Sequence, residues 1–229
     1  HWMVRRQRQM CIRDRFQVTQ KEGRRWSAAR AFLDPARGRD NLHIMTDVQV
    51  TKVLLDCGRA IGVEICDSDG AQSVIRTNKE VILSGGAINS PQLLMLSGIG
   101  EREHLSKIGI TCLQDSPEVG ENLQDHLDMT VMIKDKSRQS IGMSPFFIPR
   151  LISAFYQYFR HRRGFLASNA AEAGAFVSLL SEPDRPDAQL HFLPAYLRDH
   201  GRQLTPGFGC TIHVCQLRPK SRGQIRLAN

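Results

Sequence analysis

At 229 residues the chain has room for one large domain or two modest ones around a buried core. Hydrophobic residues make up 41% and charged residues 24%, which is usual for a globular protein and excludes a fibrous or fully disordered chain. The longest apolar stretches, such as residues 93–96, are far too short to span a membrane.

Half of the net charge of +8 lies at one end of the chain. Residues 1–15 contain five arginines and one acid, half of the net excess, and show no hydrophobic periodicity. We therefore expect a disordered or non-native tail there. The other cations are interspersed with acids, whereas a nucleic-acid-binding surface clusters them on one face, so no nucleic-acid partner is predicted.

The six cysteines form no Cys-x-x-Cys pair, and no histidine stands at metal-ligand spacing from two of them. We predict no metal site and reduced thiols. The arginine-rich start has no apolar run behind it, as a signal peptide would, so a cytoplasmic location is expected, which includes a peripheral place on the inner membrane.

The first half of the chain predicts a short helix and then a series of strands. Ser27 caps a helix over residues 27–33 that Pro35 closes. Strands follow over residues 42–46, 48–55, 60–66 and 73–77. Because turn residues such as Asp67 to Gly70 separate these strands closely, we expect an antiparallel meander.

Residues 81–83 differ because they are continuously apolar, as buried parallel strands are. They lead through Ser84, Gly85 and Gly86 into a helix for which Ser90 is the expected N-cap, Pro91 the first helical residue and Gly98 the stop. A second helix is expected over residues 101–108.

The second half predicts an antiparallel sheet with one helix beside it. Strands are expected over residues 128–135, 174–180, 189–197, 210–217 and 224–227, and a basic, aromatic, amphipathic helix over residues 146–163. His191 and His213 fall within these strands, where core histidines with satisfied hydrogen bonds are the ordinary interpretation.

Gly85 and Gly86 present a chemical possibility at the end of a strand. Two positions without side chains allow a dinucleotide to approach the backbone, and a helix N-terminus favours its anionic oxygens. The alternative is a strand–turn–helix in which the glycines only permit tight packing.

The segment over residues 85–100 resembles the second signature of the glucose–methanol–choline (GMC) family of FAD-dependent oxidoreductases. Residues 23–29, 41–55, 119–126 and 217–223 resemble further segments of that family, so the likeness covers about residues 16–229 and is closest to the choline-dehydrogenase-like branch. The signature positions filled here are Gly86, Ala87, Ser90, Pro91, Leu93, Leu94, Ser97, Gly98, Ile99 and Gly100.

The resemblance implies a mixed α/β and α+β chain. Residues 16–127 would form part of a Rossmann-like FAD-binding domain that includes the antiparallel meander, and residues 128–229 part of an antiparallel-sheet substrate domain. FAD is the implied cofactor. The residues implied to contact it are Val50 through its backbone at the adenine, Ser84, Gly85 and Gly86, and Asn122, Asp125 and His126 close to the flavin.

Each of these residues also has an ordinary structural interpretation. Val50 in a strand is usually a core residue. Asn122 can cap a turn, and Asp125 and His126 can form a local hydrogen-bonded pair that satisfies the backbone.

The implied reaction is oxidation of a primary alcohol to an aldehyde, in which hydride passes to the flavin and a histidine takes the hydroxyl proton. None of the eight histidines matches the family's catalytic position, and no Gly-x-Gly-x-x-Gly motif is present. We therefore expect an internal fragment that is poorly soluble and inactive by itself, with no catalytic residue. A non-catalytic binding or scaffold module is the rival interpretation.

The substrate and electron acceptor stay open at this point. Choline, a longer primary alcohol and a polyol derivative all agree with the sequence, as do oxygen and a respiratory acceptor. A choline site would need aromatic faces, for which Phe192, Tyr196 and Phe208 are candidates, although aromatic residues in strands are usually core.

Overall fold

The computed structural model describes residues 11–14, 19–171, 173–179, 185–198, 202–203 and 205–228. These residues fall into two compact units, each drawn from two segments of the chain. The sheet unit comes from residues 1–42 and 126–219, and the meander unit from residues 43–125 and 220–229. The assignment of residues 16–127 to FAD binding and of residues 128–229 to the substrate stays a prediction.

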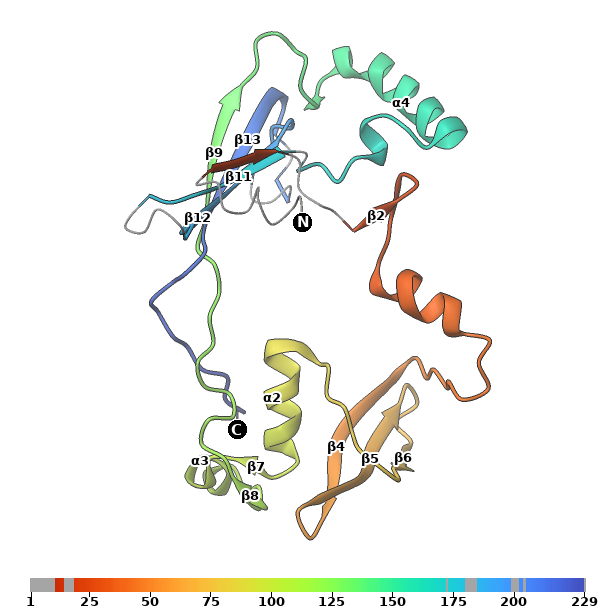
Figure 1. Ribbon diagram of the computed structural model, residues 1–229, viewed down its shortest axis with the longest axis vertical. Coiled ribbons are helices and arrows are strands. Elements are labelled where there is room, and N and C mark those ends of the chain that lie inside the picture. The colour runs from red at the N-terminus through yellow and green to blue at the C-terminus, as the bar shows by residue number, and fades with distance from the viewer. Residues whose placement is uncertain are drawn as a thin grey trace. The chain divides into compact units, whose positions relative to one another are not determined.

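The meander unit is built on three antiparallel strands, β4 (Val48–Asp56), β5 (Arg59–Asp67) and β6 (Gln72–Arg76), in that spatial order (Figure 1). The expected meander is therefore confirmed. Asp67 shapes the second turn, because its Oδ1 accepts the backbone N–H groups of Asp69 at 3.0 Å and Ala71 at 2.9 Å.

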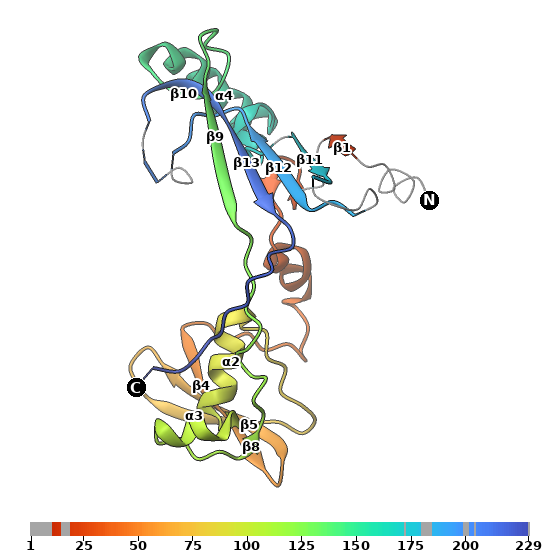
Figure 2. The ribbon, with the colours of Figure 1, turned by 90° about the vertical axis from the view of Figure 1, so that its left-hand side faces the viewer.

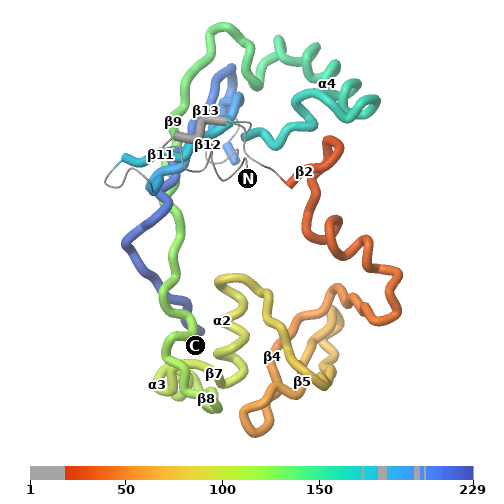
Figure 3. Tube along the Cα trace, viewed as in Figure 1, coloured from red at the N-terminus to blue at the C-terminus, as the bar shows by residue number. Residues whose placement is uncertain are grey.

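Helix α2 (Gly86–Leu96) packs beside β4 (Figure 3). It begins earlier than expected, so Ser90 and Pro91 lie within the helix and Gly85 takes the N-cap position. Because Pro91 lacks a backbone N–H, its turn of the helix has one internal hydrogen bond fewer. The predicted end is confirmed, because Gly98 follows the C-cap residue Ser97 with a φ of +84°.

The rest of the meander unit is a short helix and a returning segment. Helix α3 (Arg102–Lys107) ends before Gly109 as expected and is flanked by the parallel pair β7 (Ile99–Gly100) and β8 (Gln114–Asp115). Residues 223–226 then return to residues 120–123, where Leu123 and Gly223 exchange backbone hydrogen bonds of 2.9 and 2.8 Å. We call residues 223–226 the strap.

Four expected elements take another form. Residues 42–46, 81–83 and 224–227 form no strand within the described parts of the chain, because apolar composition does not supply a neighbouring strand for backbone pairing. Residues 27–33 form a π-helical turn, η1 (Ala29–Leu33), which continues into the 3₁₀ turn η2 (Asp34–Ala36), so Pro35 lies inside a turn.

The sheet unit holds a six-stranded antiparallel sheet, as expected, whose strands lie side by side in Figure 2. β9 (Asp128–Lys134) pairs with β13, and the other strands run in the order β1 (Cys11–Asp14), β11 (Ala173–Val177), β12 (Ala188–Leu193), β13 (Gly207–Gln216), β10 (Gly142–Met143). A separate two-stranded ribbon joins β2 (Gln20–Lys21) to β3 (Arg24–Arg25).

Strand β1 corrects the expected tail over residues 11–14, where the backbone pairs antiparallel with β11. A sheet edge offers hydrogen bonds to any extended backbone, whatever its side-chain pattern. The rest of the predicted tail, residues 1–10 and 15, lies outside the described residues.

Helix α4 (Ile148–His161) confirms the expected amphipathic helix and is preceded by the 3₁₀ turn η3 (Pro145–Phe147) and followed by η4 (Phe165–Ala167). Phe147 and Ala154 are buried on its inner side. The ring of Phe147 lies 5.5 Å from that of Phe165 and 6.3 Å from that of Phe208, measured between centroids, so aromatic packing fixes this end of the helix.

Candidate functional site

A groove of about 890 Å³ opens in the meander unit between β4, residues 81–85 and helix α2. Three of the seven predicted cofactor residues, Val50, Ser84 and Gly85, line it, and Gly86 follows directly in the chain. The groove thus brings together residues that are more than thirty positions apart in the sequence.

Val50 lies where β4 becomes irregular. It pairs with Ile65 of β5, and the register shifts before Lys52, so Thr51 is left out of the pairing. The Thr51 hydroxyl donates to Glu64 Oε1 at 2.8 Å and anchors the irregularity. The side chain of Val50 is 38% exposed, so this valine is not a core residue and its strand segment faces the groove.

Gly85 and Gly86 differ in why they lack side chains. A Cβ atom at Gly85 would lie 3.0 Å from Asn89 Cβ and 3.2 Å from Ser90 N, so tight packing in the turn into α2 disfavours a side chain there. Gly86 has a φ of +79°, and a Cβ atom there would meet nothing within 4 Å. Internal packing therefore explains Gly85, whereas open space lies beside Gly86 at the start of the helix.

The described residues that line the groove are all uncharged. Its apolar surface comes from residues such as Val50, Val63, Ile82 and Leu93. Such walls fit a flat aromatic base. Backbone N–H groups at the start of α2 fit anionic oxygens, because the first turn of a helix leaves them without internal partners. The residues present therefore fit one end of a dinucleotide.

Asn122, Asp125 and His126 lie elsewhere, on the exposed segment that follows Gly120. They are not among the described residues that line the groove. Asn122 has a φ of +62°, a left-handed conformation that asparagine tolerates, and its carbonyl accepts Gln124 Nε2 at 3.5 Å. A structural role at a turn is thus visible for Asn122.

Sequence reasoning missed a polar cluster on one face of the large sheet. Asp128 Oδ2 lies 2.7 Å from His213 Nδ1, and Asp128 Oδ1 accepts the Cys215 thiol at 3.4 Å. His191 stands opposite His213 across β12 and β13. The alternation along the strands was the available signal, because Asp128 pairs with Cys215 and both project from the face that carries His213.

The cluster shifts the proton affinity of two members. Burial raises the pKa of the Cys215 thiol, and the hydrogen bond and negative charge of Asp128 add to the rise. Burial lowers the pKa of His191, the charge of His213 lowers it further, and Asp128 opposes both effects. The Cys215 thiol therefore stays protonated and is a poor nucleophile, whereas His191 loses its proton more readily than an ordinary histidine.

The aromatic candidates for a cation site are only partly available. Phe208 is buried and packs against Phe147, so it serves the core. Phe192 keeps an exposed face. Within the described ranges, no group of three or more metal-ligating side chains comes together, and no helix has the length and apolar character needed to cross a bilayer.

The chain is similar to proteins of known family over most of its length. A family model described as GMC oxidoreductase matches residues 5–128. The alcohol dehydrogenase [acceptor] of Pseudomonas putida is 52% identical over 213 residues, which cover 93% of this chain and 39% of that protein. The oxygen-dependent choline dehydrogenase of Rhizobium johnstonii is 40% identical over 206 residues, covering 90% of this chain and 37% of that protein.

Among solved structures, a formate oxidase of Aspergillus oryzae superimposes with a TM-score of 0.81 at 25% sequence identity. The match covers 92% of this chain and 41% of the oxidase, whose structure was determined to study modification of its FAD. The chain thus spans about two fifths of the length of the proteins it matches.

Proposed function

The chain belongs to the GMC oxidoreductase family, and on that premise we propose that it supplies part of an FAD-dependent enzyme that oxidises a primary alcohol to an aldehyde. The family is FAD-dependent. FAD, when bound, accepts the hydride that leaves the alcohol carbon, and the protein contributes binding, orientation and proton transfer. Residues 16–127 serve the flavin and residues 128–229 the substrate.

The groove beside β4 is the observation that carries this proposal. Its apolar walls take the adenine, with the backbone of Val50 at its edge, while the open space beside Gly86, next to Ser84 and Gly85, takes the pyrophosphate at the start of α2. Asn122, Asp125 and His126 are proposed to lie closer to the flavin ring.

An alcohol substrate is supported by the relatives in Pseudomonas putida and Rhizobium johnstonii, which are an alcohol dehydrogenase and a choline dehydrogenase. No histidine of this chain is assigned as the base, so we propose that the chain by itself is inactive. Its proposed location is the cytoplasm, including the cytoplasmic surface of the inner membrane.

Ligand competition tests the groove. We expect the chain, once obtained in folded form, to bind FAD weakly, because it has no Gly-x-Gly-x-x-Gly motif, and we expect AMP to displace it, whereas riboflavin, which has no adenine, does not compete. Ser84→Phe fills the groove and should weaken FAD binding by about tenfold or more, the loss expected for one well-placed contact. Ser68→Phe, in an exposed turn outside the groove, is the matched control.

The rival scaffold interpretation makes the opposite prediction. A chain that binds neither FAD nor AMP, while remaining folded by circular dichroism, would favour a cofactor-free binding module. Reduction of a dye by the chain with FAD and a primary alcohol would instead contradict the proposed inactivity and would locate a base within these residues.

A further inference from the structure

Helix α4 has an apolar outer face in addition to its buried inner side. Along the helix the outer residues recur at spacings of four, three, one and three, which places them on one face. Their exposed fractions are 53% for Ile148, 65% for Ile152, 47% for Phe155, 66% for Tyr156 and 69% for Phe159. We call these five residues the outer face of α4.

The outer face is ordered rather than a set of unrelated side chains. The rings of Phe155 and Phe159 stack with centroids 6.2 Å apart and planes 11° apart. Ala154 is buried on the opposite side of the helix, so α4 is fixed to its unit by one face and presents the other. Large exposed apolar patches of this kind mark interaction surfaces.

Charge identifies the kind of partner. Residues 136–171 contain no aspartate or glutamate, while six lysines and arginines lie among them. Arg160 and Arg163 are exposed at the end of α4. The cations of this stretch are Lys136, Arg138, Arg150, Arg160, Arg162 and Arg163.

Several of these arginines extend along aromatic surface, as long cationic side chains do at membrane interfaces. The guanidinium of Arg138 lies 4.4 Å from the ring centroid of Phe146, and that of Arg162 lies 4.8 Å from the ring centroid of Tyr158. Phe146 is itself exposed and extends the apolar surface beyond the start of the helix.

Another exposed apolar stripe lacks this charge pattern. Met129, Val131 and Ile133 alternate on β9, but Asp128 and Asp135 stand at the two ends of that strand. The combination of an apolar stripe and uninterrupted positive charge distinguishes α4 from it.

We propose that the outer face of α4 is a docking surface for an anionic lipid bilayer, on which the helix lies parallel to the membrane plane. Phe155, Tyr156 and Phe159 enter the boundary between headgroups and acyl chains, and the arginines contact lipid phosphates. The proposal rests on the peripheral membrane location proposed above, and it adds which surface of the protein binds and which class of lipid that surface contacts. It does not depend on the groove beside β4.

Vesicle binding by the chain tests this surface. We expect co-sedimentation with vesicles of phosphatidylglycerol and phosphatidylcholine in equal parts, and not with phosphatidylcholine alone. Binding should weaken as salt is added, and by about fivefold for each cation removed. Arg160→Gln and Arg163→Gln are suitable single variants.

Phe159→Glu tests the apolar contribution, with an expected loss of about tenfold or more. Phe32→Glu is the matched control, because Phe32 is 76% exposed and the change in residue type and charge is the same. In a Phe155→Trp variant, quenching of tryptophan fluorescence by brominated lipids, measured against the unsubstituted chain, should show insertion.

Three results would overturn the proposal. These are equal binding by the Phe159→Glu and Phe32→Glu variants, no difference between the two vesicle compositions, or failure to bind vesicles together with self-association that Phe159→Glu abolishes. The last result would assign the face to a second copy. AMP binding by the same variants stays unchanged if only the membrane proposal fails.

Discussion

Ser97 illustrates how one hydroxyl completes a junction between a helix and a strand. It is fully buried, accepts the Val53 N–H at 2.8 Å and donates to the Leu93 carbonyl at 2.6 Å. Val53 lies on β4, the edge strand of the meander, so its N–H has no neighbouring strand to bond on that side. The serine side chain takes the place of that strand.

Ser97→Ala should therefore lower the free energy of unfolding of the meander unit by about 1–3 kcal/mol, because the buried Val53 N–H loses its acceptor. Denaturant titration measures the change, with Ser106→Ala on the exposed side of α3 as the control. Equal stability of the two variants would show that water replaces the hydroxyl.

Cys215 should react slowly with thiol reagents, because its pKa is raised by burial and by Asp128 and the thiolate is the reactive form. Since a raised pKa keeps the thiol protonated, its alkylation rate should rise only at higher pH. Asp128→Asn removes the negative charge and should increase the rate at pH 8 by about threefold to tenfold. Mass spectrometry of alkylated peptides separates Cys215 from the exposed Cys57, which serves as an internal reference. An unchanged alkylation rate of Cys215 in the Asp128→Asn variant would mean that burial alone raises its pKa.

At the scale of elements, the local patterns predicted the strands well where turns and pairing partners follow one another in sequence. β4, β5 and β6 were expected because alternating residues are separated by short turns such as Asp67 to Gly70. Residues 81–83 were predicted as a buried strand from composition alone, yet Ile82 is 77% exposed. A strand also needs a partner, and no local pattern states which segment supplies it.

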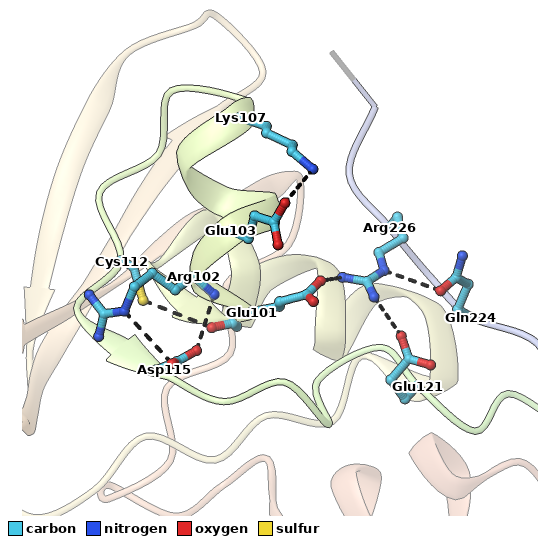
Figure 4. A network of polar contacts seen from close by, with 10 residues as sticks. Glu101, Arg102, Glu103, Lys107, Cys112, Asp115, Glu121, Gln224 and Arg226 are labelled. Atoms are coloured by element: carbon cyan, nitrogen blue, oxygen red, sulfur yellow. Dashed lines mark hydrogen bonds and ion pairs between the residues drawn. The ribbon is translucent and has the colours of Figure 1, made fainter.

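The strap is held to the meander unit by one arginine as well as by its backbone. Figure 4 shows Arg226 reaching Glu101 and Glu121, with 2.8 Å between its guanidinium and Glu121 Oε1. The Ile225 N–H also donates to the Gly120 carbonyl at 2.7 Å. Two acids that lie twenty residues apart thus share one cation.

Arg226→Met should lower the free energy needed to detach the strap from the meander unit by roughly 1 kcal/mol. Two partly exposed ion pairs are lost, and the two acids are left near each other. Hydrogen exchange of the Ile225 amide should speed up accordingly. Lys220→Met, at an exposed cation before the strap, should leave that exchange unchanged. If both variants exchange alike, the backbone bonds alone hold the strap.

For the whole molecule, the candidate site was predictable in part. The resemblance pointed to seven residues, and three of them line one groove because β4 and the start of α2 are neighbours. Asn122, Asp125 and His126 could not be placed by the same reasoning, because they lie on an exposed connection whose neighbours are not fixed by a strand or helix. The Asp128 cluster was missed because it assembles from strands that are distant in sequence.

The two units should unfold in separate transitions, because each has its own core. Met95 and Leu105 are buried in the meander unit, whereas Thr211 and Ala175 are buried in the sheet unit. Ser97→Ala should shift only the first core's calorimetric transition. Thr211→Val should shift only the transition of the sheet unit, because the Thr211 hydroxyl donates to the Ala195 carbonyl at 2.8 Å and accepts the Leu197 N–H. The free energy of unfolding of that unit should fall by about 1–3 kcal/mol. A single transition that moves with both variants would show that the units fold as one.

The strap also sets an order of events on the ribosome. Glu121 is translated about a hundred residues before Arg226, which at about 5–20 residues per second is an interval of roughly 5–20 s. During that interval the nascent meander unit carries two uncompensated acids and an open backbone edge at Gly120 and Leu123, while the strands of the sheet unit are still being made. The meander unit is therefore closed only after strands β9 to β13 of the sheet unit have been made, and a chaperone or a pause in translation that acts on this protein has its longest opportunity at that edge.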